Sequence, residues 1–333
     1  MTHNSFAGNL DSPQSPRFTR GRECAGPKIM FGILLIVACA LSSCSDNIDI
    51  KQTEAPKFVI YTFPTVNDTI PITVSVTRPI GQAALTINGI KVSCTVNGKE
   101  DEIILSDSTS VSGLPVLTYY AIGKHKAGDN VNITVSPLPV GEGTGVGSVS
   151  CFGSTTIPPL PTLDGVRLDT TFHKEDYYTD ARISFHKIDG VSYYATRLQG
   201  MDYFSESDST SYEYKEVETS MEPLLNDLTD AELGFGTKND FYHQMYVFDP
   251  SSVKSNIVTV HLNTVQQMYT RAYRVELYSL TPEYYFMLKS INDIKNNEMG
   301  EHGLAFIRPT YTNIQGGYGC VAGYGCVKSK WLK

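Results

Sequence analysis

The residue with the most clearly defined chemistry in this sequence is Cys44. It follows an apolar run, Met30–Leu41, and two small residues, Ser42 and Ser43. A secretory signal needs an apolar run of about 7–15 residues and small residues at the cleavage point. A cysteine directly after such a site is typical of bacterial lipoproteins, in which it becomes the acylated first residue. We therefore expect Cys44 to carry the lipid and residues 1–43 to be removed.

Two other readings of the apolar run fit less well. A transmembrane helix needs roughly 20 apolar residues, whereas this run stops at Cys44 and continues as the polar Ser45-Asp46-Asn47. A buried core helix would need an amphipathic pattern that continues beyond Cys44, and there is none. Several acyl chains on one cysteine, at about 0.8 kcal/mol per buried CH₂, can anchor a protein to a membrane without other help.

The composition of the remaining chain excludes some partners. Removing residues 1–43 leaves 290 of the 333 residues. Because two more basic than acidic side chains leave with the signal, the net charge at pH 7 changes from −8 to −10. Such an acidic chain is a poor nucleic-acid binder. It also gains no attraction to an anionic leaflet, so the lipid must supply the anchoring.

The cysteines suggest a disulfide. Four of the seven remain once the signal and the lipid site are set aside, namely Cys94, Cys151, Cys320 and Cys326. Export past the inner membrane permits disulfides. A straight strand would hold the sulfurs of Cys320 and Cys326 too far apart, but Gly323 and Gly325 could let the segment turn, so this pair is the candidate bridge. A Cys94–Cys151 bridge is an alternative. Zinc is a weaker one, since the usual Cys-x₂₋₄-Cys spacing is absent.

The 20 tyrosines include three in a glycine-rich tail, Tyr311, Tyr318 and Tyr324. Tyrosine suits interfaces because it has an apolar body and a polar tip. These three form a candidate contact patch for a partner protein or a glycan. The alternative, that they pack over the second half of the chain, is favoured because most aromatic side chains are buried.

Polar clusters give no clear catalytic or metal site. His173, Glu175 and Asp176 fall in a turn and could bind a cation or act as acid and base, but a solvated loop is favoured. The acidic stretch 206–218 matches no EF-type calcium loop and is better read as a solvated hairpin. The alternating glycines at 141–147 lack the Lys-Ser/Thr of a phosphate loop. We expect no catalytic residue, metal or cofactor. A hydrolase with a site assembled from distant residues stays open, because triads are spatial.

The surrounding elements are mostly strands. β-branched and aromatic runs recur at roughly 8–12-residue spacing with Asn-Gly and Asp-Gly turns, a pattern typical of β-sandwiches. Thr281-Pro282-Glu283 marks a helix start, and an apolar stripe at three- and four-residue spacing follows it. The sequence therefore predicts a mainly β fold, with two immunoglobulin- or fibronectin-like β-sandwich domains, a C-terminal helix and a glycine-rich tail.

The expected organisation has seven parts. In chain order they are the signal (1–43), a tether (44–56), an N-terminal β-sandwich (57–136), a Gly/Pro-rich linker (137–163), a second β-rich domain (164–280), a helix (281–297) and the glycine-rich tail (298–333).

Three motifs, together with the lipid signal, carry a resemblance to a known family. They are Tyr273–Leu277, Leu280–Tyr285 and Asn313–Gly319. In this order they resemble Bacteroidetes outer-membrane lipoproteins grouped as domain of unknown function four-two-four-nine. The resemblance implies an outer-membrane lipoprotein without an established activity, working as an accessory beside a TonB-dependent transporter or its ligand. A periplasmic or surface hydrolase is the alternative. Cys320 and Val321 depart from the family's usual apolar or aromatic residues.

Overall fold

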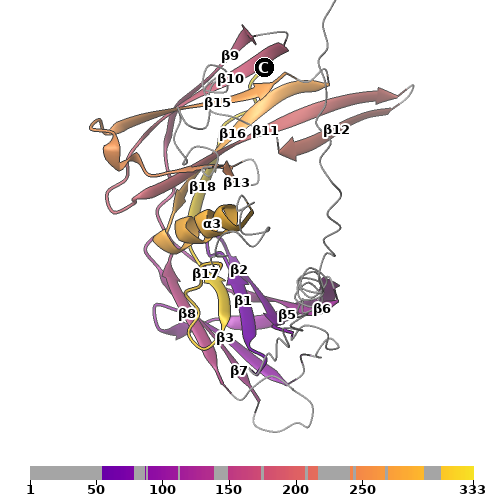
Figure 1. The fold of residues 1–333 in the computed structure, drawn as a ribbon, viewed down its shortest axis with the longest axis vertical. Coiled ribbons are helices and arrows are strands. Elements are labelled where there is room, and N and C mark those ends of the chain that lie inside the picture. Colours follow the sequence, from indigo (N-terminus) through magenta and orange to yellow (C-terminus); the bar gives the residue numbers. More distant parts are fainter. Residues whose placement is uncertain are drawn as a thin grey trace, which may run out of the picture. The chain divides into compact units, whose positions relative to one another are not determined.

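The described part of the chain is mainly β, as the sequence predicts (Figure 1). The computed structural model describes residues 55–78, 87, 89–111, 113–138, 149–173, 176–206, 209–216, 241–242, 245–266, 269–295 and 309–333, all within one compact unit, Gln52–Lys333. Cys44 and the predicted signal lie outside these residues. Within them, no helix has the length and apolar character needed to cross a bilayer.

One pair of sheets is built mainly from the first half of the chain. A five-stranded sheet has the order β17 (Tyr318–Val321), β1 (Phe58–Thr62), β2 (Thr69–Val76), β6 (Leu114–Ile122) and β5 (Glu102–Val111). A four-stranded sheet has the order β4 (Lys99–Glu100), β3 (Ile90–Val96), β7 (Asn130–Pro137) and β8 (Cys151–Thr156). Asn97 and Gly98, both with positive φ, make the β3–β4 turn that the Asn-Gly pair predicts.

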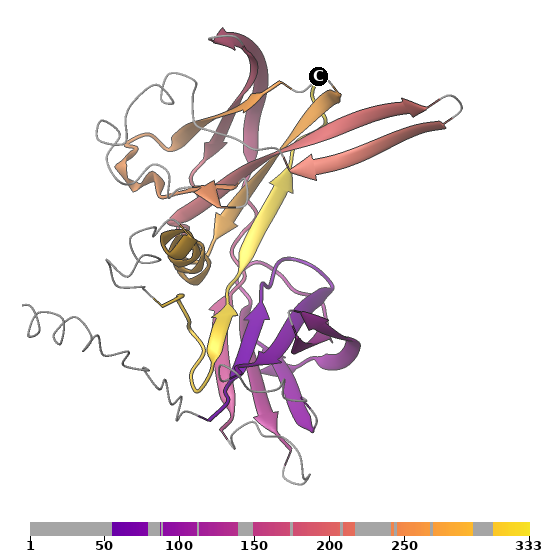
Figure 2. The ribbon, with the colours of Figure 1, turned by 45° about the vertical axis from the view of Figure 1, so that its right-hand side comes forward.

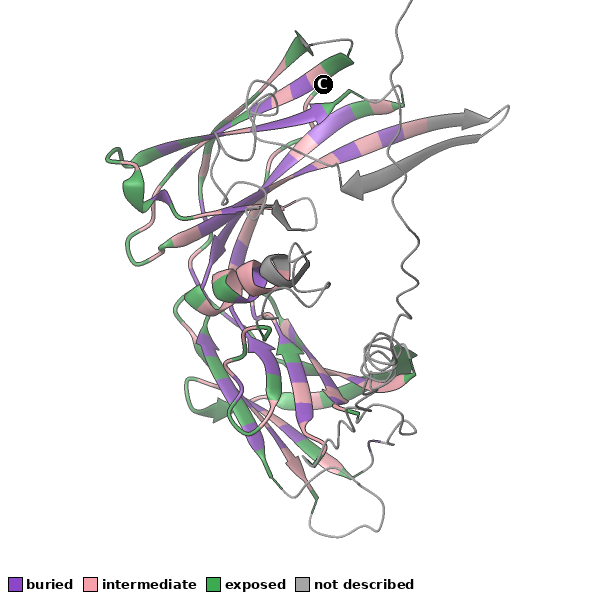
Figure 3. Ribbon diagram, viewed as in Figure 1, coloured by how far each residue is buried: buried purple, intermediate pink, exposed green. Residues whose placement is uncertain are grey.

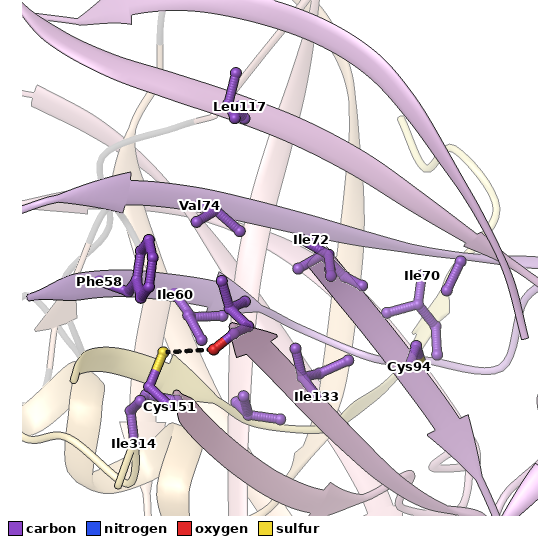
Figure 4. Packing of buried hydrophobic residues seen from close by; sticks show 14 of the residues in the cluster. Phe58, Ile60, Ile70, Ile72, Val74, Cys94, Leu117, Ile133, Cys151 and Ile314 are labelled. Atoms are coloured by element: carbon purple, nitrogen blue, oxygen red, sulfur yellow. Dashed lines mark hydrogen bonds between the residues drawn. The ribbon is translucent and has the colours of Figure 1, made fainter. Parts of the chain in front are cut away.

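These two sheets bury a shared hydrophobic cluster (Figure 4). Alternate residues of β1 and β2 point into it, so buried and less buried positions alternate along each strand (Figure 3). Ile60, Ile72 and Ile133 are fully buried there. Cys151 also lies in the cluster, and its thiol donates to the Val135 carbonyl oxygen at 3.7 Å.

A second pair of sheets comes mainly from the second half of the chain. A three-stranded sheet has the order β15 (Ile257–Val265), β10 (Asp176–His186) and β9 (Leu163–His173). A six-stranded sheet has the order β13 (Phe241–Tyr242), β14 (Met245–Phe248), β11 (Tyr193–Glu206), β16 (Thr270–Leu280) and β18 (Tyr324–Lys328), with β12 (Ser209–Glu216) also on β11. Phe185, Leu198 and Leu277 lie in the hydrophobic cluster of this pair.

The predicted C-terminal helix is present as α3, Pro282–Lys295. It begins directly after Thr281, with Pro282 at its first position and Glu283 in its first turn, where the helix dipole favours a carboxylate. Met287 and Leu288 pack in a third cluster with Tyr278 and Leu280 of β16. The helix therefore covers the face of the six-stranded sheet opposite to the cluster of the second sheet pair.

The C-terminal segment joins both pairs of sheets. β17 pairs in parallel with β1, and β18 pairs antiparallel with β16 (Figure 2). The sequence placed both strands in a glycine-rich tail and β8 in a linker stretch. The sequence predicts loops for these three segments because each contains glycine, which is usually depleted in strands.

Candidate interaction surface

The structure separates the three predicted interface tyrosines. Tyr311 and Tyr324 are half-buried and pack in the cluster around α3. The Tyr324 ring lies 5.9 Å from that of Tyr284 and 6.0 Å from that of Tyr278, measured between ring centroids. Tyr318 is 42% exposed, with the Lys57 ammonium 5.2 Å from its ring centroid. Of the three, Tyr318 is the most exposed and Tyr311 and Tyr324 are partly covered by the cluster.

The candidate disulfide between Cys320 and Cys326 is not formed. Both residues are free cysteines, as are Cys94 and Cys151. Cys320 pairs with Tyr61 in one sheet and Cys326 with Tyr278 in another, so the segment between them is stretched from sheet to sheet rather than turned back. An extended chain separates residues six positions apart by roughly 20 Å, far beyond the Cα distance of a disulfide.

Thiol titration should find four free cysteines. Burial, with a smaller contribution from Glu283, raises the pKa of Cys320 to about 12, and burial with Glu276 raises that of Cys326 to about 11. Because the thiolate is the reactive form, we expect slow reaction of the folded protein with a thiol reagent at pH 7. In denaturant the chain from Ser45 onward should show four thiols. A count of two would mean that a disulfide exists and would contradict this arrangement.

A buried carboxylate lies on the face of the six-stranded sheet that α3 partly covers. Glu276 is 0% exposed and is the cross-strand neighbour of Arg197 on β11 and Lys328 on β18. Its Oε2 accepts from Arg197 Nη2 at 2.5 Å, from Arg197 Nε at 2.9 Å and from the Tyr278 hydroxyl at 2.5 Å. Its Oε1 lies 2.6 Å from Lys328 Nζ. The cluster thus ties three strands together across one row.

The protonation of this cluster indicates a structural role. Burial raises the pKa of Glu276, but the hydrogen bonds from Lys328, Tyr278 and Arg197, with the Arg197 charge, outweigh burial and leave the pKa below its usual value. Burial also raises the pKa of Tyr278, as do nearby Cys326 and its own hydrogen bond to Glu276. At neutral pH the carboxylate is ionised and the phenol is neutral. Neither group titrates near pH 7, where a general acid or base works best.

Other polar candidates also have structural explanations. The described part of the acidic stretch lies in a hairpin, since β11 and β12 pair from Gln199↔Glu216 to Glu206↔Ser209. His173 and Asp176 are opposite each other at the end of the β9–β10 hairpin, and Glu175 lies outside the described residues. Among the residues that the structure describes, no three His, Cys, Asp or Glu side chains are grouped to hold a metal. The glycines at 141–147 also lie outside the described part.

One His–Asp pair was not singled out from the sequence. His125 is buried, with Nε2 2.9 Å from Asp101 Oδ2 and Nδ1 2.8 Å from the Asn67 carbonyl oxygen. Both ring nitrogens are therefore engaged within the fold. The pair fixes the loop after β1 against the start of β5.

An exposed apolar row crosses the outer face of the five-stranded sheet. Cross-strand pairing places Pro71, Tyr120 and Ile104 side by side on β2, β6 and β5. Tyr120 is 37% exposed and Ile104 47% exposed; Ile122 and Tyr61 on the same face are also exposed. The solvent face of an antiparallel sheet is usually polar, and contiguous exposed apolar patches often mark interaction sites. We call these five residues the outer-face row.

Part of the outer-face row, the residues on β6, could be predicted from the sequence. In β6, Tyr119 and Ala121 alternate with Tyr120 and Ile122, so both faces of the strand are apolar. Such a pattern indicates that a strand is covered on both sides. Its alignment with Pro71 and Ile104 depends on pairing between distant strands, which the sequence does not display.

A small cavity opens between β14 and β15. Its volume is about 240 Å³, and its walls combine apolar and polar side chains. The lining residues are Tyr246, Phe248, Asp249, Pro250, Ser252, Val253, Val258, Thr259, Val260 and His261. It is smaller than the ~300–1,000 Å³ of typical small-molecule pockets.

Comparisons with known proteins place the chain in a family. No curated protein matches the sequence. The model of a domain of unknown function, DUF4249, matches residues 46–330, which covers both pairs of sheets, α3 and the C-terminal strands. The match begins two residues after Cys44. The chain belongs to the DUF4249 family.

Proposed function

We propose that this protein is a lipid-anchored accessory protein of the outer membrane that binds a TonB-dependent transporter or the ligand of that transporter. The lipid on Cys44 would hold it at the membrane, and the folded part would make the contact. The lipoprotein-type segment Met30–Cys44 supports the anchor. The resemblance of the family motifs to Bacteroidetes outer-membrane lipoproteins supports the partner class.

The outer-face row is the observation that carries a binding role. It exposes two tyrosines, a proline and two isoleucines on one sheet face, where Glu102, the cross-strand neighbour of Ile122, adds a charge at the edge. Tyrosine is enriched in the energetically dominant part of interfaces. A membrane β-barrel partner that covered this row would remove its apolar area from water, at roughly 25 cal/mol per Å².

The architecture behind this role is part of the proposal. Two pairs of sheets, each around its own hydrophobic cluster, would be two β-sandwich domains of the immunoglobulin or fibronectin kind. Such domains commonly serve as binding modules on cell surfaces.

Site-specific photocrosslinking tests the role of the row. A benzophenone amino acid would replace Tyr120, and the lipidated protein would be expressed in its native host. We expect an adduct with a transporter barrel, and co-purification of that barrel in mild detergent. Phe172, exposed on β9 in the other pair of sheets, is the matched control.

A charge on the row gives the second measurement. Ile104→Glu should lower recovery of the barrel at least tenfold while leaving the melting temperature nearly unchanged, because the residue is exposed. Recovery of the lipoprotein alone, with no adduct from position 120, would count against the accessory role.

A further inference from the structure

The three-stranded sheet leaves β15 at one edge, because the described residues place no strand on its far side. The Gln266 N–H donates to the Tyr177 carbonyl oxygen, and the Lys187 N–H donates to that of Asn256. In an antiparallel ladder these bonds alternate. Val258 and Val260 therefore turn their backbone groups toward β10, whereas Thr259 turns its N–H and C=O away. Thr259 presents one donor and one acceptor to whatever lies alongside.

The two edges of this sheet differ in protection. β9 carries the ion pair Arg167–Asp169, with 2.9 Å between Nη2 and Oδ1, and its pairing with β10 shifts register near Ser184. Charges and bulges are the usual means by which proteins prevent strand addition. β15, with the sequence IVTVHLNTV, has no lysine, arginine, proline or glycine and keeps one register with β10 throughout, and its one ionisable side chain, His261, lies 3.5 Å from Asp180 of β10. Of the two edges, β15 is the one open to an added strand.

The cavity lies along this unprotected edge. Tyr246 and Phe248 form one wall with their rings stacked at 5.0 Å between centroids, and Val258 and Val260 of β15 form another. A cavity of about 150 Å³ holds benzene, so about 240 Å³ accepts one large side chain. Asp249, which is exposed, is the one carboxylate among the lining residues, and its Oδ1 accepts from the Ser251 N–H at 2.8 Å.

We propose that β15 binds an extended peptide segment of a partner protein as an added strand. One aromatic or large aliphatic side chain of the segment fills the cavity, and a neighbouring lysine or arginine faces Asp249. Main-chain hydrogen bonds would supply affinity and the cavity would supply sequence preference, as in other cases of strand addition. The inference specifies how the partner of the proposed function is recognised, and it rests on that function.

Selection from a displayed library of linear nine-residue peptides tests it, with the lipidated full chain in detergent as the target. We expect enriched peptides to carry an aromatic or large aliphatic residue with a basic residue beside it. Thr259→Pro should weaken their binding at least tenfold, because proline removes the outward N–H. The ladder to β10 does not use that N–H, so the fold should persist. Thr170→Pro makes the same change at the outward-facing edge of β9 and should leave binding unchanged.

Each outcome separates this inference from the proposed function. Peptide binding that is insensitive to Thr259→Pro, or no enriched peptide, would overturn the strand-addition site even if a transporter is captured through the outer-face row. Peptide binding that depends on Thr259, without any transporter in the pull-down, would uphold the site and count against the accessory role. A dimer of this chain that Thr259→Pro dissociates would assign the edge to a second copy and overturn the peptide proposal.

Discussion

Replacing Gly319 by alanine should unfold the protein or destabilise it by at least about 4 kcal/mol, a loss that few single substitutions cause. Gly319 lies in β17 with φ +106°, a conformation that L-residues rarely adopt. A Cβ there would stand 1.9 Å from the Ile60 carbonyl oxygen of β1. β17 would have to move away from β1, and the pairing of the C-terminal strand with the five-stranded sheet would be lost. Denaturant unfolding monitored by circular dichroism measures the change.

Two other glycines distinguish the two causes of the loss, backbone strain and steric clash. Gly128 has φ +89° but no atom within 4 Å of a built Cβ, so Gly128→Ala should show backbone strain alone, about 1–2 kcal/mol. Gly323 has no positive φ, but its Cβ would lie 2.0 Å from the Thr156 carbonyl oxygen, so Gly323→Ala isolates the steric clash. If Gly319→Ala cost no more than Gly128→Ala, the close approach of β17 to β1 would be refuted.

The same close approaches explain which strands the sequence could predict. Strand β3, Ile90–Val96, is of the kind that the sequence predicts, because its β-branched residues and the Asn97-Gly98 turn that follows are local signals. The sequence did not predict β8 and β17 as strands, because Gly153 and Gly319 are of a residue type that is typical of loops. Tertiary packing requires glycine at position 153, because a Cβ there would lie 2.6 Å from Ile314 Cδ1. Such a contact joins residues far apart in the chain and leaves no local pattern.

The candidate sites divide in the same way. The apolar run that ends in Ser42-Ser43-Cys44 is a linear pattern, so the sequence alone is enough to predict a lipid signal there. The outer-face row needs the register of β2, β6 and β5, and the β15 cavity needs β14 beside it. Both arise from pairing and packing between distant segments. The prediction of a Cys320–Cys326 bridge was wrong for a related reason. The two cysteines are close in sequence, but Cys320 lies in β17 and Cys326 in β18, and these strands belong to different sheets.

Replacing Glu276 should give the second large effect, a loss of about 3 kcal/mol for Glu276→Ala. Removing one partner of a buried ion pair typically costs about 3–5 kcal/mol, because the remaining charge stays buried. Arg197 is 17% exposed and would bear that penalty, whereas Lys328, at 50% exposed, can turn to water. The estimate therefore lies at the low end of the range. Glu276→Gln keeps the shape and removes only the charge, so it should cost less than Glu276→Ala.

An exposed ion pair of the same type is the matched control. Arg167 and Asp169 are 73% and 35% exposed, with 2.9 Å between Nη2 and Oδ1, so Asp169→Asn should change stability by no more than about 0.5 kcal/mol. Denaturant unfolding of the three variants measures these differences. Equal losses for Glu276→Ala and Asp169→Asn would mean that the buried cluster does not stabilise the junction of β11, β16 and β18.

The pH dependence of the Glu276 effect has a definite sign. The pKa of Glu276 is lower in the folded protein than the ~4.3 of an unfolded chain. The folded state therefore binds fewer protons there, and the stabilisation is fully present above about pH 4.3 and is lost as the pH falls through the folded pKa. The wild-type protein should lose more stability than Glu276→Gln between pH 5 and pH 3, because the variant has no proton to take up at this position. If the difference in stability between the wild-type protein and Glu276→Gln stayed constant as the pH falls, the charge of the Glu276 carboxylate would not be the source of the stabilisation.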